Sequence, residues 1–404
     1  MTRAGPERRA LALWAMAAGL ALWAPAVAVP GLPLPLQPMD VVAILGWPLI
    51  AVFLPRVRAS LVLVLGSGAA SVGLSWAVSG GEALILGWTI GCAFPAVAAL
   101  ALAVADPLAR GWFTRAVMTG AAASALLFLA QLALGAEALD FRTNPAFRLP
   151  PQHGRGFALF PEVATFAAHM LLALALGMAL ALHPGTGRRA RRAAAGVVLL
   201  CLCALILSRS TSVLVVLPPL AVLVLARTSR ASVNALVLAG LASLALAGLI
   251  ALFLQSVYAE RLETDAATRS AAMRLASILG GLSPLIDGQV FGVGIGNNAL
   301  VRFPAFEAAR ALGLSFGRLP EGVNAQIVGR IFEEGWPAVV HLCAAGWLLA
   351  LVLARARGPV PVALACLAAA SLMTAGAVVG YRGIYAAWLW LALPAGLLSG
   401  GQRA

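Results

Sequence analysis

Lysine is absent from the 404-residue sequence, and charged residues of all kinds make up only 11% of it. Soluble domains carry about 25% charged residues. With 62% hydrophobic residues and a mean hydropathy of +0.95, the chain has too little charged surface for a soluble globular domain. Apolar runs of about 20 residues recur throughout, each long enough to cross a hydrocarbon core of about 30 Å. The composition therefore predicts an integral membrane protein.

Little in the sequence favours metal, disulfide or nucleic-acid chemistry. No Cys/His cluster has the spacing of a ligand set, so we expect neither a metal nor another cofactor. The net charge of +13 comes from arginines scattered between the apolar runs, which argues against a nucleic-acid partner. Five cysteines lie inside apolar runs and are interpreted as small core residues: Cys92, Cys201, Cys203, Cys343 and Cys366.

The apolar runs predict an all-α polytopic membrane protein with about twelve transmembrane helices. We place the spans at roughly 10–29, 39–55, 60–78, 83–104, 116–136, 157–182, 193–208, 212–226, 232–254, 336–354, 359–379 and 384–399. The chain forms one polytopic domain over 1–404, with a large extracytoplasmic loop at 255–335 between the ninth and tenth spans. Because a structureless loop of this length is improbable, we predict helices at 261–282 and 304–312 that fold as a cap over the outer surface.

The arginines set the orientation. Sixteen arginines lie in short segments that alternate along the chain with the segments that hold the other twelve. The positive-inside rule predicts that the first set of segments is cytoplasmic, and this set includes both termini. The first span has two interpretations. Its basic start and the run Ala26-Val27-Ala28 resemble a signal peptide with a cleavage site, whereas the alternation of the later spans favours an uncleaved helix.

Three arginines are candidates for binding phosphate. Arg209 lies between the seventh and eighth spans, in a very tight turn at the outer boundary. It either snorkels to the headgroups or binds phosphate bidentately, and position alone does not decide. Arg269 and Arg274 are about 140° apart on a helix. They lie on a headgroup-facing helix, or they form a cationic ledge for an anionic lipid-linked substrate.

Two further segments hold candidate groups. The run Gly292-x-Gly294-x-Gly296 predicts a tight turn with close backbone approach, not a nucleotide site, since no strand–helix unit follows. The segment that leads into the tenth span places Asn324, Arg330, Glu333 and Glu334 at the membrane mouth, where the carboxylates either act as a base or are simply solvated. Glu162, at the head of the sixth span near Arg155, can pair with an arginine or accept a proton.

Several short motifs occur in one order over Arg155 to Leu353. They are Arg155-Gly156-Phe157 with Pro161-Glu162, Ser208-Arg209-Ser210, Thr268-Arg269, Pro284, the glycine run, Asn324 and Glu333-x-Gly335. In that order the chain resembles the O-antigen polymerase and O-antigen ligase family of bacterial envelope glycosyltransferases, which implies a C-type glycosyltransferase-like fold.

The resemblance implies metal-independent inverting glycosyl transfer on the outer face of the bacterial inner membrane, from a polyprenyl-diphosphate-linked glycan donor to a glycan acceptor. Arg209 and Arg269 would hold the diphosphate and stabilise the leaving group. Glu162 and Glu333 are the catalytic carboxylates that we favour, although His153 and Glu321 also remain candidates for the base. Further substrate contacts are expected from Arg155, Arg274, Asn324, Arg330 and His153. Besides the bilayer, a chain-length regulator or flippase is a possible partner.

Polymerisation of repeat units is the activity we favour. A glycine eleven residues after an arginine is associated with polymerases of the family, and Arg269, Arg302 and Arg318 each have one. Ligases place a histidine directly before the Asn, where this chain has Val323, so ligase activity is second. A transporter or flippase also has about twelve spans, but it usually shows internal repeats and ionisable groups in mid-membrane, and neither is evident in the sequence.

Overall fold

The computed structural model describes residues 5–31, 35–53, 59–145, 156–228, 266–313, 319–320, 322–323 and 325–373. Within these ranges the chain is helical and forms no strand, and one isolated bridge pairs Gly81 with Ile295. Six of the described helices are long and apolar enough to cross a membrane: Val62–Ser79, Ala83–Ala105, Pro107–Leu134, Val163–Leu182, Arg188–Ser208 and Trp336–Arg355. By length and composition the chain is a polytopic helical membrane protein.

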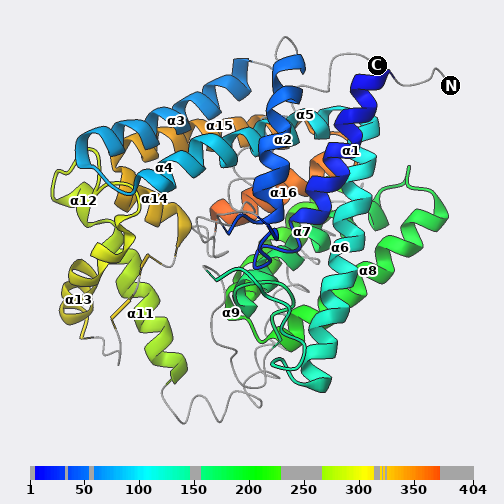
Figure 1. Ribbon diagram of the computed structural model, residues 1–404. Coiled ribbons are helices and arrows are strands. Elements are labelled where there is room, and N and C mark those ends of the chain that lie inside the picture. Colours follow the sequence, from blue (N-terminus) through cyan, green and yellow to red (C-terminus); the bar gives the residue numbers. More distant parts are fainter. Residues whose placement is uncertain are drawn as a thin grey trace.

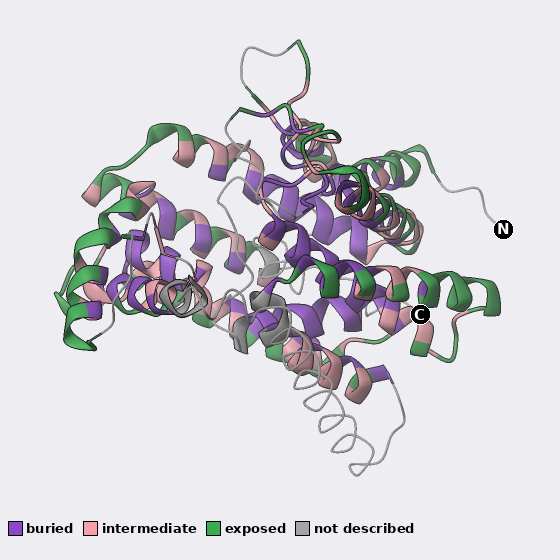
Figure 2. Cartoon of the chain, turned by 90° about the horizontal axis from the view of Figure 1, so that it is seen from below, coloured by how far each residue is buried: buried purple, intermediate pink, exposed green. Residues whose placement is uncertain are grey.

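Helix α7 (Val163–Leu182) is the centre of the main bundle (Figure 1). It packs against α6 (Pro107–Leu134), α8 (Arg188–Ser208), α9 (Thr211–Thr228) and α16 (Pro359–Met373). Because α7 is apolar on every side, it can be buried all round, and most of its residues are buried. Buried residues occupy the middle of the molecule in Figure 2. Helices α1 (Pro6–Ala21) and α2 (Pro38–Phe53) complete the bundle, α1 along α6 and α2 along α5.

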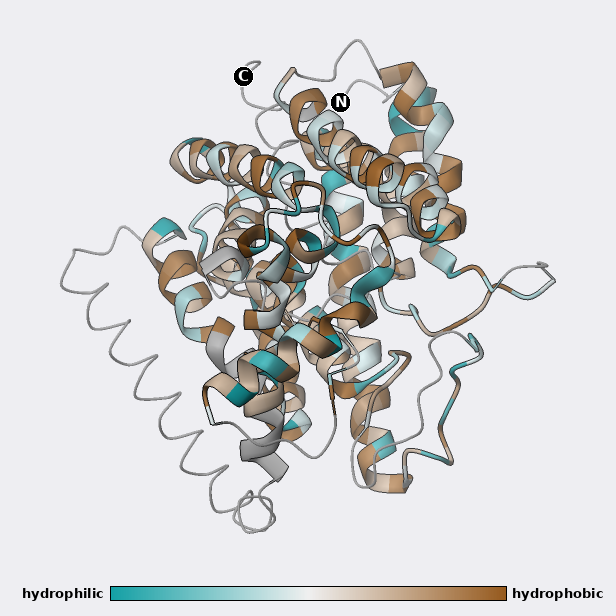
Figure 3. Cartoon of the chain, turned by 90° about the vertical axis from the view of Figure 1, so that its left-hand side faces the viewer, coloured by the Kyte–Doolittle hydropathy of each residue, from teal (hydrophilic) through white to brown (hydrophobic). Residues whose placement is uncertain are grey.

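A second group of spans lies beside the bundle. Helix α3 (Ala59–Ser79) packs along α15 (Trp336–Arg355). Helix α4 (Ala83–Trp88), the π-helical turn η2 (Thr89–Ala93) and α5 (Phe94–Ala105) form one continuous span. Figure 1 shows α3, α4 and α15 side by side, and apolar residues cover most of the helices in Figure 3.

The described part of the predicted loop, residues 266–335, forms a helical cap with its own small core. The cap contains α11 (Ala266–Gly281), α12 (Ser283–Ile286), η3 (Asn297–Val301), α13 (Arg302–Ala311) and α14 (Gln326–Glu334). Its core is built from Ala276, Val301, Ala305, Ala309 and Phe332. Helices α11 and α13 cross so closely at Gly280 that a Cβ there would collide with the backbone of Ala305. The helices predicted in the loop at 261–282 and 304–312 overlap α11 and α13, whereas α12, η3 and α14 were not predicted. Residues 261–265 lie outside the described residues.

Some predicted span boundaries are wrong. Helix α6 begins at Pro107, nine residues before the predicted start of that span, because Asp106 caps it by accepting from the backbone N–H groups of Leu108 and Ala109. Helix α7 begins at Val163 instead of 157, because the segment 156–162 forms turns. The predicted spans at 232–254 and 384–399 lie outside the described residues.

Candidate functional site

Polar side chains form two groups, and each group contains or adjoins residues that the sequence predicted as part of a site. One is the junction of the cap with α3 and α15, and the other is the pair of loops that precede α7. The first group, which we call the α3–α14 cluster, is buried apart from the half-buried Ser67. Ionisable groups buried among membrane spans are costly, so they mark a functional site or a structural joint. The cluster contains Ser67, Ser71, Ser75, Arg330, Glu333, Glu334 and His341.

Arg330 and Glu334 form a two-pronged ion pair one helical turn apart on α14. The Arg330 Nε lies 2.9 Å from Oε1 of Glu334, and its Nη2 donates to Oε2. Ser71 of α3 donates to the same Oε2 over 2.6 Å. Both members of the pair are at most 4% exposed, so the interaction is little screened by water. Of the two alternatives considered from the sequence, the structure excludes the one in which the carboxylates of Glu333 and Glu334 are simply solvated.

Four serines on one face of α3 join that helix to the cap and to α15. Ser67 Oγ lies 3.0 Å from Nδ1 of His341, and Ser75 donates to the carbonyl of Glu333 over 2.6 Å. Ser79 donates to the carbonyl of Gly292 over 3.0 Å. Sequence reasoning missed this row. The signal that could have found it is the spacing Ser67, Ser71, Ser75, Ser79, because residues four apart share one helix face.

The glycine run of the cap allows the close approach that the sequence predicted. Gly292, Gly294 and Gly296 all have positive φ. The N–H of Gly294 donates to the carbonyl of Glu333 over 3.0 Å, and a Cβ at Gly292 would lie 2.6 Å from that carbonyl group. Beyond it, Ile295 accepts from the N–H of Glu82 at the head of α4. The run therefore ties α14, the cap and the turn between α3 and α4 into one unit.

Glu333 has no exposed surface. Its carboxyl group lies inside the protein at the end of α14, while its carbonyl binds both Ser75 and Gly294. A base at this position is sealed from bulk water.

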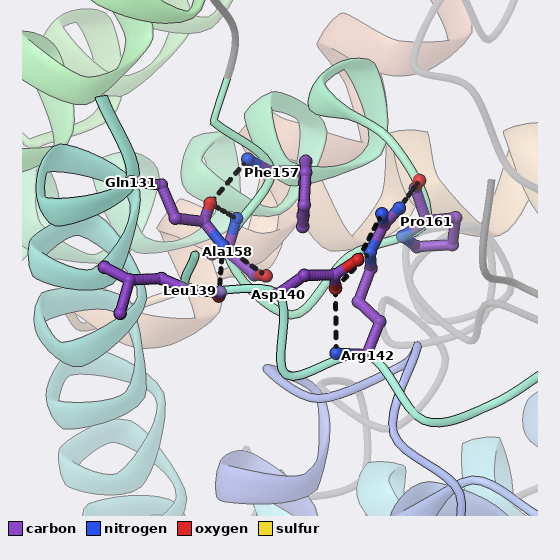
Figure 4. Close-up of polar contacts among 7 residues, drawn as sticks. All are labelled: Gln131, Leu139, Asp140, Arg142, Phe157, Ala158 and Pro161. Carbon is purple, nitrogen blue, oxygen red and sulfur yellow. Dashed lines mark hydrogen bonds and ion pairs between the residues drawn. The ribbon is translucent and has the colours of Figure 1, made fainter. Parts of the chain in front are cut away.

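The second group of polar residues holds the segment 156–162 in a fixed shape, and we call it the loop clamp (Figure 4). Gln131 of α6 accepts from the N–H groups of Phe157 and Ala158 over 2.8 and 2.7 Å, and donates to the carbonyl oxygens of Leu139 and Ala158. The hydrogen bonds of Gln131 hold the backbone of Ala158 at a φ of 50°, a conformation that is unfavourable for a residue with a Cβ.

Arg142 completes the loop clamp. Its guanidinium makes a two-pronged pair with Asp140, with both N–O distances 2.9 Å, and donates to the carbonyl of Pro161 over 2.8 Å. It also lies 3.6 Å from the centre of the Phe157 ring. The clamp therefore fixes the residue directly before Glu162. Glu162 itself is half-buried at the N-cap of α7, where the helix dipole favours a negative charge.

Arg209 is exposed and occupies the turn between α8 and α9 with φ 52° and ψ 34°. The predicted tight turn is confirmed, because α9 begins only two residues later at Thr211. A left-handed conformation costs a non-glycine residue about 1–2 kcal/mol. Because α7 and α8 are joined by a five-residue turn and pack along each other, Arg209 and Glu162 lie at the same end of the bundle.

The other predicted residues are placed as follows. Arg269 and Arg274 both lie on α11, and the side chain of Arg274 is half-exposed. Helix α11 packs on α13 and α14, whereas α9 packs on α7 and α16, so the described packing does not bring Arg209 and Arg274 together. Arg155, His153, Glu321 and Asn324, together with the side chain of Arg269, lie outside the described residues. In the described ranges no group of three or more His, Cys, Asp or Glu side chains is arranged to hold a metal ion.

No known protein-family model matches this chain, and no curated protein matches its sequence.

Proposed function

We propose that the protein polymerises lipid-linked oligosaccharide repeat units on the outer face of the bacterial inner membrane. The donor is a glycan on a polyprenyl diphosphate, and the acceptor is a second glycan. The observation that carries the proposal is Arg209: an exposed guanidinium at the end of an apolar helix, on a backbone that glycine would adopt at lower cost. Strained residues of this kind concentrate at functional sites.

The proposed topology has twelve spans, both termini in the cytoplasm and the cap outside. A parity argument supports it. Between the α3–α4 turn and the cap lie the span 83–105, α6, α7, α8, α9 and the apolar stretch 232–254. Six crossings return the chain to the side on which it began. The hydrogen bonds between Ile295 and the α3–α4 turn support an even number of crossings, since those two segments meet.

In the proposed reaction a hydroxyl oxygen of the acceptor attacks the anomeric carbon of the donor sugar. The new C–O bond forms as the bond to the diphosphate breaks, and the diphosphate leaves with the electron pair. Arg209, with Arg269, would stabilise the growing charge on the leaving group, as fixed cations do without a metal. Glu162, held at the same end of the bundle by the loop clamp, is our first choice as the group that takes the hydroxyl proton. The remaining substrate contacts expected from the sequence are Arg155, Arg274, Asn324 and His153. Arg330 was also expected there, but its guanidinium is held in the buried pair with Glu334.

The test uses cells that lack the gene and are complemented with variants. Deletion is expected to shorten the surface or secreted polysaccharide to single repeat units. Arg209→Gly suits the left-handed backbone and removes only the guanidinium, so the protein should fold normally and lose activity by about 100-fold or more. Arg209→Lys retains charge without the bidentate fork and should rescue partly. Arg188→Ala, at the other end of the same helix, is the matched control and should be fully active.

An unchanged chain-length profile after deletion would exclude polymerisation. Full-length chains that are no longer joined to their acceptor would indicate the ligase reaction instead. A transporter is the second class of function, and the observation that favours it is the buried α3–α14 cluster between two spans. If the protein is a transporter, we expect repeat units to accumulate on the cytoplasmic face after the gene is deleted.

A further inference from the structure

The large apolar side chains of α13 point away from the core of the cap. Ala305 and Ala309 form the buried face against α11, whereas Phe303 is 77% exposed and Phe306 is 53% exposed. In a water-soluble helix the aromatic rings would occupy the buried face and the small residues the outer one. The cap could bury Phe rings only by displacing alanines that allow α11 and α13 to pack closely. Something other than water therefore covers this outer face.

The attachment of α13 identifies what covers it. Helix α13 continues from η3, which begins directly after Gly296, and a Cβ at Gly296 would lie 3.0 Å from Glu82 at the head of α4. With about 2.0 Å of rise per residue in the 3-10 helix η3 and about 1.5 Å in α13, Phe303 and Phe306 are about 13–18 Å along the chain from the head of a membrane span. The polar layer of a bilayer is about 5–8 Å thick on each side. A helix that starts this close to the head of a span can lie along the membrane surface.

The cap has further exposed apolar residues, and one of them contacts the start of a span. Ile286 is 80% exposed. The N–H of Trp336, the first residue of α15, donates to the carbonyl of Val290. Val290 and Trp336 are themselves about half exposed, as is usual for apolar and aromatic groups where a span enters the membrane.

The charges on α13 also suit a lipid surface. Arg302 and Arg310 are exposed, and Glu307 is the only acidic residue of this helix. On a helical wheel Phe303, Phe306 and Arg310 fall within about 60° of each other. Arginine next to inserted rings can reach the lipid phosphates while its alkyl stem stays among apolar groups.

We propose that α13 is an interfacial helix that lies in the plane of the bilayer, with Phe303 and Phe306 among the lipids at the surface where α15 begins. The occupant of this face is the bilayer itself, attracted by the two rings and by arginine contacts to phosphate. The cap is thereby held down on the membrane at two places, the α3–α14 cluster and α13. This inference depends on the membrane class of the chain and not on the glycosyltransferase proposal.

The test measures collision rates of nitroxide spin labels in the full-length protein, with its five native cysteines replaced by alanine. The protein is reconstituted in vesicles of phosphatidylcholine and phosphatidylglycerol. Labels are placed singly at Phe303 and Phe306. Reference labels are placed at Leu126, on the exposed side of α6 in mid-span, and at Arg188, the exposed first residue of α8. Retained elution volume in detergent shows that each labelled protein is folded.

Labels at Phe303 and Phe306 are expected to collide with oxygen at least several-fold more often than with a water-soluble nickel chelate, as at Leu126. Collision with the chelate as frequent as at Arg188 would place α13 in water and overturn the proposal. Low collision with both reagents would also overturn it, because it would show that protein, such as a second copy of the chain, covers this face.

Discussion

At the scale of single residues, the Arg330–Glu334 pair holds a full charge of each sign inside the protein. Removing one partner leaves the other charge buried and unbalanced, which costs about 3–5 kcal/mol, whereas replacing both by apolar residues is often nearly neutral. We expect Glu334→Gln to lower the thermal unfolding temperature of the purified protein in detergent markedly. Ser71→Ala should lower it less, because it removes only one hydrogen bond to a charged group, worth about 1.5–3 kcal/mol.

The double variant Arg330→Met, Glu334→Leu provides the control for this prediction. It should be more stable than Glu334→Gln if the penalty comes from an uncompensated charge. A double variant that unfolds at a lower temperature than Glu334→Gln would show that the pair itself stabilises the joint.

Gly81 is the second residue for which the structure makes a sharp prediction. It has a φ of 131°, and a Cβ there would overlap the carbonyl oxygen of Ile295. Gly81→Ala should therefore separate the α3–α4 turn from the cap and destabilise the protein by more than about 1 kcal/mol. The control is Gly73→Ala in the same helix hairpin, where nothing lies within 4 Å of the new methyl group. Because alanine is the better helix former, this control should be stabilised by up to about 1 kcal/mol. Equal unfolding temperatures for the two variants would contradict the close approach.

At the scale of elements, the sequence predicts best where a helix is decided by its own residues. Spans such as 60–78 and 336–354 agree with α3 and α15 within a residue or two, since length and apolarity suffice. The start of α6 was misplaced because Arg110 and Arg115 interrupt the apolar run, although Asp106 and Pro107 give a local signal of an N-terminus. Helix α14 was missed for a different reason: its buried face includes Arg330, Glu333 and Glu334, which a hydropathy pattern assigns to solvent.

The loop clamp is an element that no sequence pattern predicts, because Gln131 and Arg142 act on backbone groups 15 to 30 residues away. We expect Gln131→Leu to leave the N–H groups of Phe157 and Ala158 buried without an acceptor, at about 1–3 kcal/mol each. The segment 156–162 should then exchange its amide hydrogens faster, while the exchange rates of α8 and α9 stay unchanged. Hydrogen exchange read by mass spectrometry checks this. The control is Thr114→Ala, which removes only a bond within α6 to the carbonyl of Arg110.

At the scale of the whole molecule, the sequence alone predicts the class but not the arrangement. Low charge and recurrent apolar runs decide that the chain is a helical membrane protein, since no other fold class tolerates this composition. The four serines of α3 and the glycine run of the cap are separated by more than 200 residues, and each is a weak signal by itself. Only the tertiary structure shows that the serine row of α3 and the glycine run of the cap contact each other. The sequence could identify Glu333 as a candidate but not reveal that its carboxyl group is sealed.

The contact between the α3–α4 turn and the cap also leads to a prediction about the topology, which is the last one. The α3–α4 turn and the cap touch through Gly81 and Ile295, so reporters of membrane side inserted near Ala308 and fused after Gly80 must agree. The five-residue turn between α7 and α8 is separated from the α3–α4 turn by three crossings, namely the span 83–105, α6 and α7, so a reporter after Gly185 must disagree with both. By the positive-inside rule, the arginines after that turn predict a cytoplasmic position for it: Arg188, Arg189, Arg191 and Arg192. We therefore expect extracytoplasmic reporter activity at the first two positions and cytoplasmic activity at the third. Opposite signals at the first two would mean that an odd number of crossings separates the α3–α4 turn from the cap, in which case the hydrogen bonds between Ile295 and that turn could not form.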